Sequence, residues 1–292
     1  MTVLETTDLT ITLDGQPLVR DMALRLAARD RVGLIGESGS GKSLTALALL
    51  GLLPAGMRAT GRILIDGRDH RDASDREWRR VRGRTLAMVF QEPLTALDPL
   101  MTVGRQIAGP LRLHEGLNRA DAQRRAIDWC HRVHLPDPQR LVHALPHQIS
   151  GGQRQRVALA MALACRPRVL IADEPTTALD VTVQAQILAL LDELIEETGV
   201  ALLFISHDLP VVAGLARHLL VMRDGRLVES GAADNVLRRP RSDYARHLVR
   251  SAAQVTRLAP TSVDHGQTRD ISDSRMARMP MINESGTEGG QS

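Results

Sequence analysis

Residues 36–43 read GESGSGKS, which matches G-x-x-x-x-G-K-[ST], the pattern of a phosphate-binding P-loop. Three glycines allow the backbone to curl so that successive N–H groups point at one anion. The apolar residues 31–35 predict a buried strand before the loop, and residues 44–53 predict a helix after it. The positive end of that helix adds to the same site. This context favours nucleotide phosphate binding over a chance glycine-rich turn.

The chain contains 37 lysine and arginine residues, and Lys42 in the loop is the only lysine among them. A compact ammonium group fits between phosphate oxygens where a planar guanidinium does not. The use of lysine at this one position therefore supports the phosphate-site interpretation, with Lys42 reaching the β- and γ-phosphates and the Ser43 hydroxyl holding Mg²⁺.

Composition is typical of a globular protein, with 43% hydrophobic and 24% charged residues over 292 positions. The net charge of +3 is spread along the chain, which favours a solvated surface over a nucleic-acid or membrane patch. Cys130 and Cys165 lack metal-ligand spacing and are expected to be structural thiols. No secretory signal and no apolar run of about 18–20 residues is evident, so we expect a cytoplasmic location.

Strand and helix patterns alternate along the chain, which predicts an α/β fold with a mainly parallel sheet flanked by helices. Alternating residues over 3–13 and 18–26, joined by a turn, predict an N-terminal antiparallel β-subdomain. Residues 103–145 are helical by pattern, and we expect an all-helical insertion over about 100–165. We assign one nucleotide-binding domain to residues 1–250 and a C-terminal extension to 251–292, which turns polar and aperiodic after about 259 and is predicted to be disordered.

Two further segments carry candidate chemistry. An apolar strand pattern over 168–172 ends in Asp173 and Glu174. At the end of a strand beside a P-loop, the first carboxylate is suited to hold magnesium and the second to deprotonate an attacking water. Ser150 and two glycines precede a predicted helix, which is a second anion-binding design and requires a second phosphate group or a second molecule.

The P-loop, Ile149-Ser-Gly-Gly-Gln153, Val169–Glu174, Thr177-Ala-Leu-Asp180 and His207, in this order, resemble the ATP-binding cassette (ABC) ATPases. The resemblance covers about residues 3–250 and implies a P-loop NTPase fold that hydrolyses ATP with Mg²⁺. It also implies that two cassettes bury two ATP molecules between them, each cassette contacting the ATP on the P-loop of its partner.

The resemblance implies the following roles by motif match: catalysis by Glu174 and His207; ATP binding by Gly36, Glu37, Ser38, Gly39, Ser40, Gly41, Lys42, Ser43 and Gln91; Mg²⁺ binding by Ser43, Gln91 and Asp173; contact with the ATP of the partner by Ser150, Gly151, Gly152 and Gln153; and a dimer-interface position for Asp180.

Residues 91–99 and 239–248, with a Q-x-P-x-x-x-L-x-P stretch and a Pro…Tyr…Leu segment, resemble the oligopeptide, dipeptide and nickel importer branch. That branch implies two membrane permeases, an extracytoplasmic substrate-binding protein, a second cassette of the same or another kind, and a peripheral place on the cytoplasmic face of the inner or plasma membrane. No cysteine follows Cys165, so we expect no iron–sulfur cluster. No aromatic residue precedes Trp78, and Leu13 takes the place where the family stacks adenine. Loss of that ring is worth about 1 kcal/mol, and we expect it either to weaken ATP binding several-fold or to relax the choice between ATP and GTP.

The competing class is a soluble ABC ATPase that acts on nucleic acid or the ribosome. Such proteins usually carry two cassettes in one chain, or a long coiled coil or zinc hook. This chain shows one cassette, no heptad run and no Cys-x-x-Cys, so we expect an importer subunit that binds no nucleic acid. A purely regulatory ATP-binding module is disfavoured by the intact Asp173–Glu174 pair and by His207.

Overall fold

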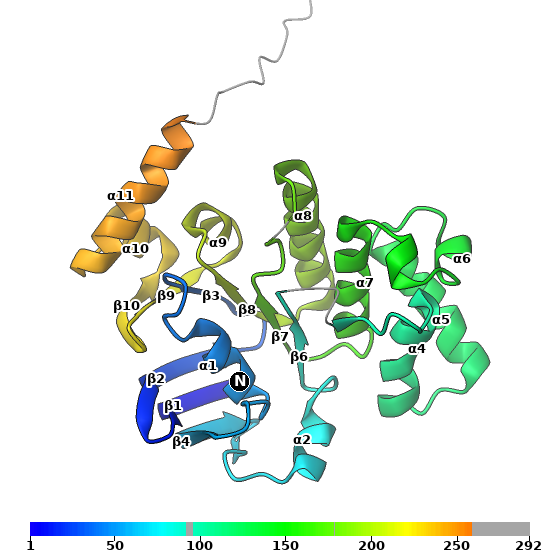
Figure 1. Cartoon of the computed structure of the whole chain (residues 1–292), viewed down its shortest axis with the longest axis horizontal. Helices are drawn as coiled ribbons and strands as arrows, with labels where there is room; N and C mark the ends of the chain where they lie inside the picture. The colour runs from blue at the N-terminus through cyan, green and yellow to red at the C-terminus, as the bar shows by residue number, and fades with distance from the viewer. Residues whose placement is uncertain (92–95, 178, 259–292) are drawn as a thin grey trace, which may run out of the picture.

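The computed structural model describes residues 1–91, 96–177 and 179–258, and it contains two β-sheets with helices around them (Figure 1). The smaller sheet is antiparallel in the order β2-β1-β4-β5. Its strands are β1 (Thr2–Leu13), β2 (Gln16–Ala27), β4 (Met57–Ile65) and β5 (Arg68–Asp69). The N-terminal antiparallel subdomain predicted from sequence is therefore present.

The larger sheet has six strands in the order β10-β9-β3-β8-β7-β6, and only β10 runs antiparallel to its neighbour. Its strands are β3 (Arg31–Ile35), β6 (Leu86–Val89), β7 (Val169–Asp173), β8 (Ala201–Ser206), β9 (His218–Arg223) and β10 (Arg226–Ala232). Every residue of β3, β7 and β8 is buried, as expected for parallel strands covered on both faces. The predicted mainly parallel α/β fold is confirmed.

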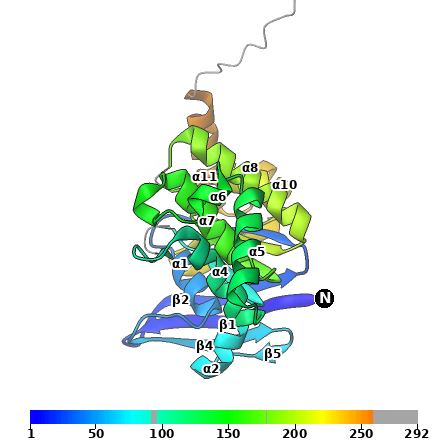
Figure 2. The same cartoon turned by 90° about the vertical axis from the view of Figure 1, so that its right-hand side faces the viewer.

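Some helices pack around the larger sheet, and four others form a separate group at one side of it (Figures 1 and 2). That group consists of α4 (Val103–His114), α5 (Arg119–Arg132), α6 (Pro138–Leu141) and α7 (Gly151–Leu163). The other described helices are α1 (Lys42–Leu49), α2 (Asp75–Val81), α8 (Val181–Thr198), α9 (Leu209–Leu215), α10 (Ala233–Arg238) and α11 (Asp243–Leu258). Within the group α4–α7, helix α7 contacts β6 and α8 and so links the group to the rest of the domain.

The two faces of the larger sheet belong to two hydrophobic cores. In β8, Leu202 and Phe204 point into the core shared with the helices, whereas Leu203 and Ile205 point into the core shared with α1 and the antiparallel sheet. Successive side chains of a strand alternate between faces, so one apolar strand serves both cores. The central strands are thereby buried on both faces.

Helix α1 is shorter than the sequence pattern predicts, because it ends at Leu49 and not near Leu53. Arg82 donates from Nε to the carbonyl of Leu50 and from Nη2 to that of Gly51, each at 2.7 Å. Gly51 has a φ of +62°, and a Cβ there would lie 2.3 Å from the ring of Trp78. A distant arginine and tryptophan therefore end the helix, which apolar periodicity alone does not reveal.

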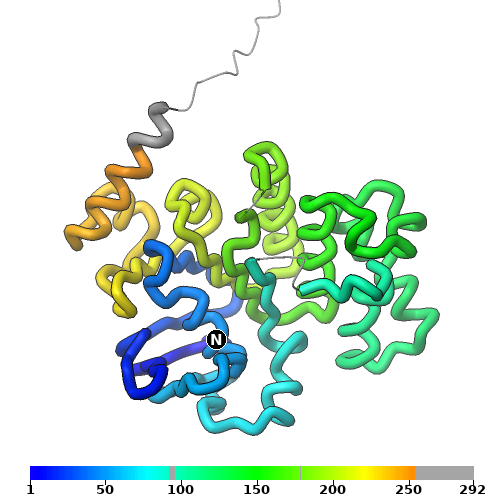
Figure 3. Tube along the Cα trace, in the orientation of Figure 1, coloured from blue at the N-terminus to red at the C-terminus, as the bar shows by residue number. Residues whose placement is uncertain are grey.

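Strand β4 pairs with β1 along its whole length, from Leu13 opposite Met57 to Leu4 opposite Ile65. At the other end of the chain, α11 lies beside β10 and α9, on the side of the sheet away from α4–α7 (Figure 3). This helix continues to Leu258 and so runs into the extension expected from 251. Residues 259–292, where the sequence predicts disorder, lie outside the described residues.

Candidate functional site

The predicted site residues follow the carboxyl ends of four neighbouring parallel strands. The P-loop follows β3, Gln91 comes two residues after β6, and Glu174 and His207 directly follow β7 and β8. Because β3, β8, β7 and β6 are consecutive in the sheet, these loops meet at one edge, where open α/β sheets bind ligands. They surround a cavity of about 550 Å³ that is lined by the P-loop, Gln91, Glu174, Thr177, His207 and Leu248.

The P-loop is held in shape by its own lysine. Lys42 Nζ donates to the carbonyls of Gly36 at 2.8 Å and Glu37 at 2.9 Å, and only 5% of Lys42 is exposed. Burial lowers the pKa of Lys42, and the charges of Glu174 and Asp173 oppose that shift. Gly36 is required by close approach, because a Cβ there would lie 2.1 Å from the carbonyl oxygen of Met222.

Helix α1 begins with a residue that cannot cap it. Gly41 is the N-cap with a φ of +102°, a left-handed conformation that favours glycine, and it offers no side chain to the first-turn amides. Those amides and the positive end of the helix are thereby left to an anion. Ser40 is buried, and within the described residues its Oγ has no hydrogen-bond partner.

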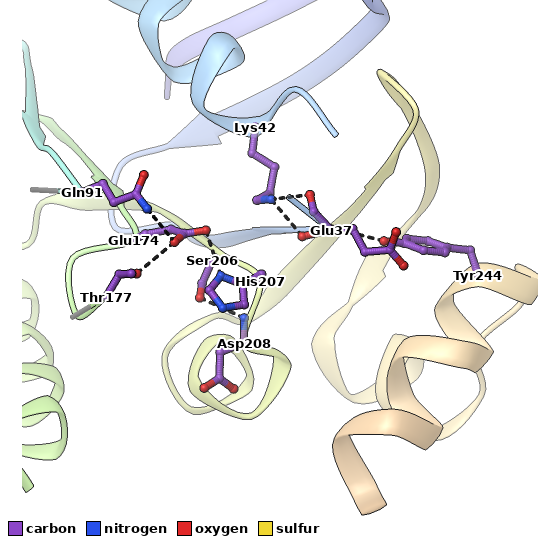
Figure 4. A network of polar contacts seen from close by, with 10 residues as sticks. Glu37, Lys42, Gln91, Glu174, Thr177, Ser206, His207, Asp208 and Tyr244 are labelled. Atoms are coloured by element: carbon purple, nitrogen blue, oxygen red, sulfur yellow. Dashed lines mark hydrogen bonds and ion pairs between the residues drawn. The ribbon is translucent and has the colours of Figure 1, made fainter. Parts of the chain in front are cut away.

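Glu174 is the most constrained residue of the cavity (Figure 4). Its backbone φ is 45°, in the left-handed region that non-glycine residues seldom adopt, and its N–H donates to the carbonyl of Ile205 at 2.9 Å. One carboxylate oxygen accepts hydrogen bonds from Gln91 Nε2 at 3.2 Å and from Thr177 Oγ1 at 2.9 Å. The other oxygen lies 2.9 Å from His207 Nδ1.

This network fixes the charge of Glu174. Burial alone would raise its pKa, but hydrogen bonds from His207 and Thr177 and the nearby positive charges lower the pKa overall. Glu174 is therefore a carboxylate at neutral pH. Because a carboxylate only accepts hydrogen bonds, the proton of His207 that faces it lies on Nδ1. The arrangement can hold a water molecule and accept its proton.

Asp173, at the end of β7, is 4% exposed and its pKa is raised by burial and by the charge of Glu174, while Ser43 and Lys42 act in the opposite direction. Among the described residues, Asp173 Oδ1 has no hydrogen-bond partner. A buried carboxylate oxygen without a partner, beside a serine hydroxyl, is the donor chemistry that Mg²⁺ selects. Asp173 and Ser43 therefore fit a magnesium site, and Ser43 and Gln91 both line the cavity.

The second predicted anion-binding segment does not line this cavity within the described chain. Ser150 caps α7 through a capping box, in which its Oγ accepts from Gln153 N–H at 3.3 Å and Gln153 Oε1 accepts from Ser150 N–H at 2.9 Å. Asp180 caps α8 by accepting from Val183 N–H at 2.9 Å. The two helix starts touch, because a Cβ on Gly152 would lie 2.7 Å from Val183. They form one surface with exposed Ser150 and Gly151.

The sequence analysis gave no role in the site to three residues in or beside the cavity. Thr177 holds Glu174, Tyr244 contacts Glu37 and Leu248 lines the cavity wall. Thr177 could have been found from its position three residues after Glu174, but the others come from α11, which the sequence analysis did not predict. Leu13 lies half-buried at the end of β1 and is not part of the described cavity wall. Residues Glu92–Thr95 of the Q-x-P segment and Ala178 lie outside the described residues.

The fold and the site together define a P-loop nucleotide-binding protein. A family model described as "ABC transporter" matches residues 19–177, more than half of the chain. The chain belongs to the ABC transporter family, which confirms the resemblance.

Three curated relatives come from this family. The "Peptidoglycan transport ATP-binding protein YejF" of Agrobacterium fabrum is 50% identical over 75% of this chain and 40% of its own length. The "Probable peptide ABC transporter ATP-binding protein y4tR" of Sinorhizobium fredii is 47% identical over 76% of this chain and 67% of its own length. The "Glutathione import ATP-binding protein GsiA" of Salmonella typhimurium is 46% identical over 83% of this chain and 40% of its own length. This chain thus spans less than half of the Agrobacterium and Salmonella relatives. All three names describe ATP-binding proteins of transport, and that of the Salmonella relative specifies import.

Solved structures show the same fold. The ATP-binding cassette MJ0796, in a dimeric post-hydrolysis state bound to ADP and Pi, superimposes with a TM-score of 0.70 at 29% identity. The match covers 79% of this chain and 98% of that one. Within the described part of our chain, no helix combines the length and apolar character that a membrane crossing needs.

Proposed function

We propose that this chain is the ATP-hydrolysing subunit of an ABC importer that takes up peptides or related small solutes. The observation that carries the proposal is the Glu174 carboxylate, which is ionised, held by Gln91, Thr177 and His207, and faces the same cavity as the P-loop. Glu174 takes the proton from a water that attacks the γ-phosphate, and His207 fixes the orientation of the carboxylate. The names of the relatives support peptide-type substrates, and nickel is the other cargo implied by the resemblance.

The phosphates of ATP bind to the amides of residues 36–43 and to Lys42, whose ammonium exchanges the carbonyls of Gly36 and Glu37 for phosphate oxygens. Ser43, Asp173 and Gln91 are the residues we assign to Mg²⁺. When bound, the ion neutralises charge on the β- and γ-phosphates. The unpartnered, buried Oδ1 of Asp173 supports this assignment.

A second cassette completes the site. The surface formed by the α7 and α8 starts offers exposed donors, and beside Asp180 it carries Val181, an apolar side chain that is 83% exposed. Exposed apolar residues next to polar donors are typical of a protein interface. Ser150, Gly151, Gly152 and Gln153 then contact the ATP on the P-loop of the partner, which is either a second copy of this chain or a related cassette.

Two membrane permeases are the partners through which hydrolysis drives transport. An apolar groove of about 300 Å³ runs between the end of α1, β6 and the helical segment, and Leu52, Phe90 and Pro110 are among its lining residues. Leu100 and Leu113, both in the same region of the chain, are 88% and 78% exposed. Phe90 is followed by Gln91, which bonds to Glu174, so a permease segment in the groove lies one residue from the catalytic network.

The proposal includes a peripheral place for the chain on the cytoplasmic face of the membrane, with an extracytoplasmic binding protein that selects the cargo. The experiment is affinity purification of the tagged Glu174→Gln chain from membranes with ATP and Mg²⁺, followed by mass spectrometry. We expect two integral membrane proteins and a cassette. Recovery of ribosomes or nucleic acid without integral membrane proteins would overturn the importer proposal and favour a soluble ABC ATPase.

A further inference from the structure

Helix α11 is anchored to the nucleotide-binding domain at its first turn. The carboxylate of Glu229, in β10, accepts the backbone N–H groups of Arg241 at 2.9 Å and Ser242 at 2.8 Å, and the Ser242 hydroxyl at 2.9 Å. Ser242 Oγ in turn accepts from the N–H of Ala245 at 3.1 Å and so caps the helix. The start of α11 is therefore fixed on the sheet.

Tyr244, in that first turn, reaches the P-loop (Figure 4). Its hydroxyl oxygen accepts the backbone N–H of Glu37 at 2.9 Å, and the residue is 6% exposed. The guanidinium carbon of Arg223 lies 5.1 Å from the centre of the ring. Burial raises the pKa of Tyr244, which keeps its hydroxyl neutral. Tyr244 is the only tyrosine of the chain.

The two sides of the Glu37 residue are thus held by different parts of the protein. Its N–H is bound by Tyr244 from α11, and its carbonyl is bound by Lys42 from α1. One turn after Tyr244, Leu248 lines the cavity beside the P-loop and His207. Helix α11 also packs on α9, which begins two residues after His207. The same helix therefore contacts both the P-loop and the helix that follows His207.

We infer that Tyr244 is a positioning residue for ATP binding: its hydroxyl fixes the first peptide of the P-loop in the conformation that receives the phosphates. The inference rests on the proposed ATP binding at this loop. When ATP arrives, Lys42 leaves the carbonyl of Gly36, which belongs to the same peptide as the Glu37 N–H, and the bond to Tyr244 is the one that still orients this peptide. The hydroxyl touches no reacting atom, so its loss changes ATP affinity and leaves the turnover of bound ATP intact.

The test compares full-length wild type with Tyr244→Phe, which removes the hydroxyl and keeps the buried ring. We expect about five- to tenfold weaker ATP binding, as for loss of one buried hydrogen bond, with kcat within about twofold of wild type. Equilibrium dialysis gives the affinity, and hydrolysis at saturating ATP, in the assembly that copurifies with the chain, gives kcat. The matched control is Ser242→Ala, which weakens the cap of the same helix without touching the P-loop and is expected to bind ATP like wild type.

Three results would overturn the inference. Equal ATP affinity of Tyr244→Phe and wild type would remove the hydroxyl from any positioning role. An equal loss of affinity in Ser242→Ala would assign the effect to loosening of α11 in general. Absence of ATP binding by the wild-type chain would overturn both this inference and the proposed function, whereas the first two results leave the proposed function standing.

Discussion

Helices α1 and α7 both begin with glycine-rich turns, but their first amides are used differently. Gly41 at the start of α1 provides no cap, and Lys42, Glu174 and His207 surround the same cavity. Ser150 at the start of α7 closes a capping box with Gln153. Neither residue lines the described cavity that contains Glu174. In our proposal the first helix start is a phosphate site, whereas the second supplies only donors. One chain would then hold a site and the complement to the site of a partner.

The largest expected effect is on the rate of ATP hydrolysis, when the proposed base Glu174 is replaced. Glu174→Gln keeps the size of the side chain but removes the base, so turnover should fall about 10²–10⁴-fold, or about 3–5 kcal/mol of barrier. ATP affinity should remain, because the P-loop is unchanged. Phosphate release by the purified assembly measures the first quantity and equilibrium dialysis the second. Undiminished turnover would remove Glu174 from the base role and leave α1 with binding alone.

Binding at the α1 site depends on Lys42. Lys42→Ala removes a charge-assisted hydrogen bond worth about 1.5–3 kcal/mol, so ATP should bind about ten- to a hundredfold more weakly. Lys42→Arg is the matched variant, and the planar guanidinium is expected to rescue little of the loss. Calorimetric titration with ATP and Mg²⁺ distinguishes these outcomes. Wild-type affinity in Lys42→Ala would contradict the assignment of the phosphate site to α1.

Asp173 provides a pH-dependent contrast. Its pKa is raised in the folded chain, so burial of the charged form destabilises the fold above that pKa, and this cost is lost as pH falls through it. Without nucleotide at neutral pH, Asp173→Asn should therefore be more stable than wild type, and the difference should shrink as the pH is lowered.

Urea unfolding in the presence of a metal chelator measures this difference across the pH range. Asp234→Asn is the control, because that side chain is 84% exposed and its replacement should change little. A lower free energy of unfolding for Asp173→Asn than for wild type at neutral pH would contradict this expectation. It would show that the carboxylate stabilises the fold without a bound cation.

The smallest effect concerns the base of the nucleotide. Leu13→Tyr restores a ring where the family stacks adenine, and about 1 kcal/mol of stacking should tighten ATP binding several-fold. Leu13→Met, which has no ring, should leave the affinity unchanged. Titrations with ATP and GTP follow both variants. If the tyrosine variant binds both nucleotides like wild type, adenine does not lie against the end of β1.

The gathering of the candidate phosphate-site residues at one sheet edge could be predicted from sequence, because they belong to short motifs at strand ends. Residues 36–43, the Asp173–Glu174 pair and His207 each lie next to an apolar strand that the pattern reveals, and parallel strands bring their ends together. The three hydrogen bonds to the Glu174 carboxylate and the hydrogen bond between Glu37 and Tyr244 could not be predicted. Tyr244 and Glu37 lie 207 residues apart, and only the docking of α11 on the sheet brings them into contact.

The central claim, that the α7 start serves the ATP of another cassette, is tested most directly by Ser150→Asp. Aspartate caps a helix as well as serine does, so the fold is kept, but its charge opposes a γ-phosphate. With the α1 site intact, the purified assembly should bind ATP like wild type. Its turnover should fall at least about tenfold, because like charges a few ångströms apart repel by several kcal/mol. Wild-type turnover in this variant would contradict the claim.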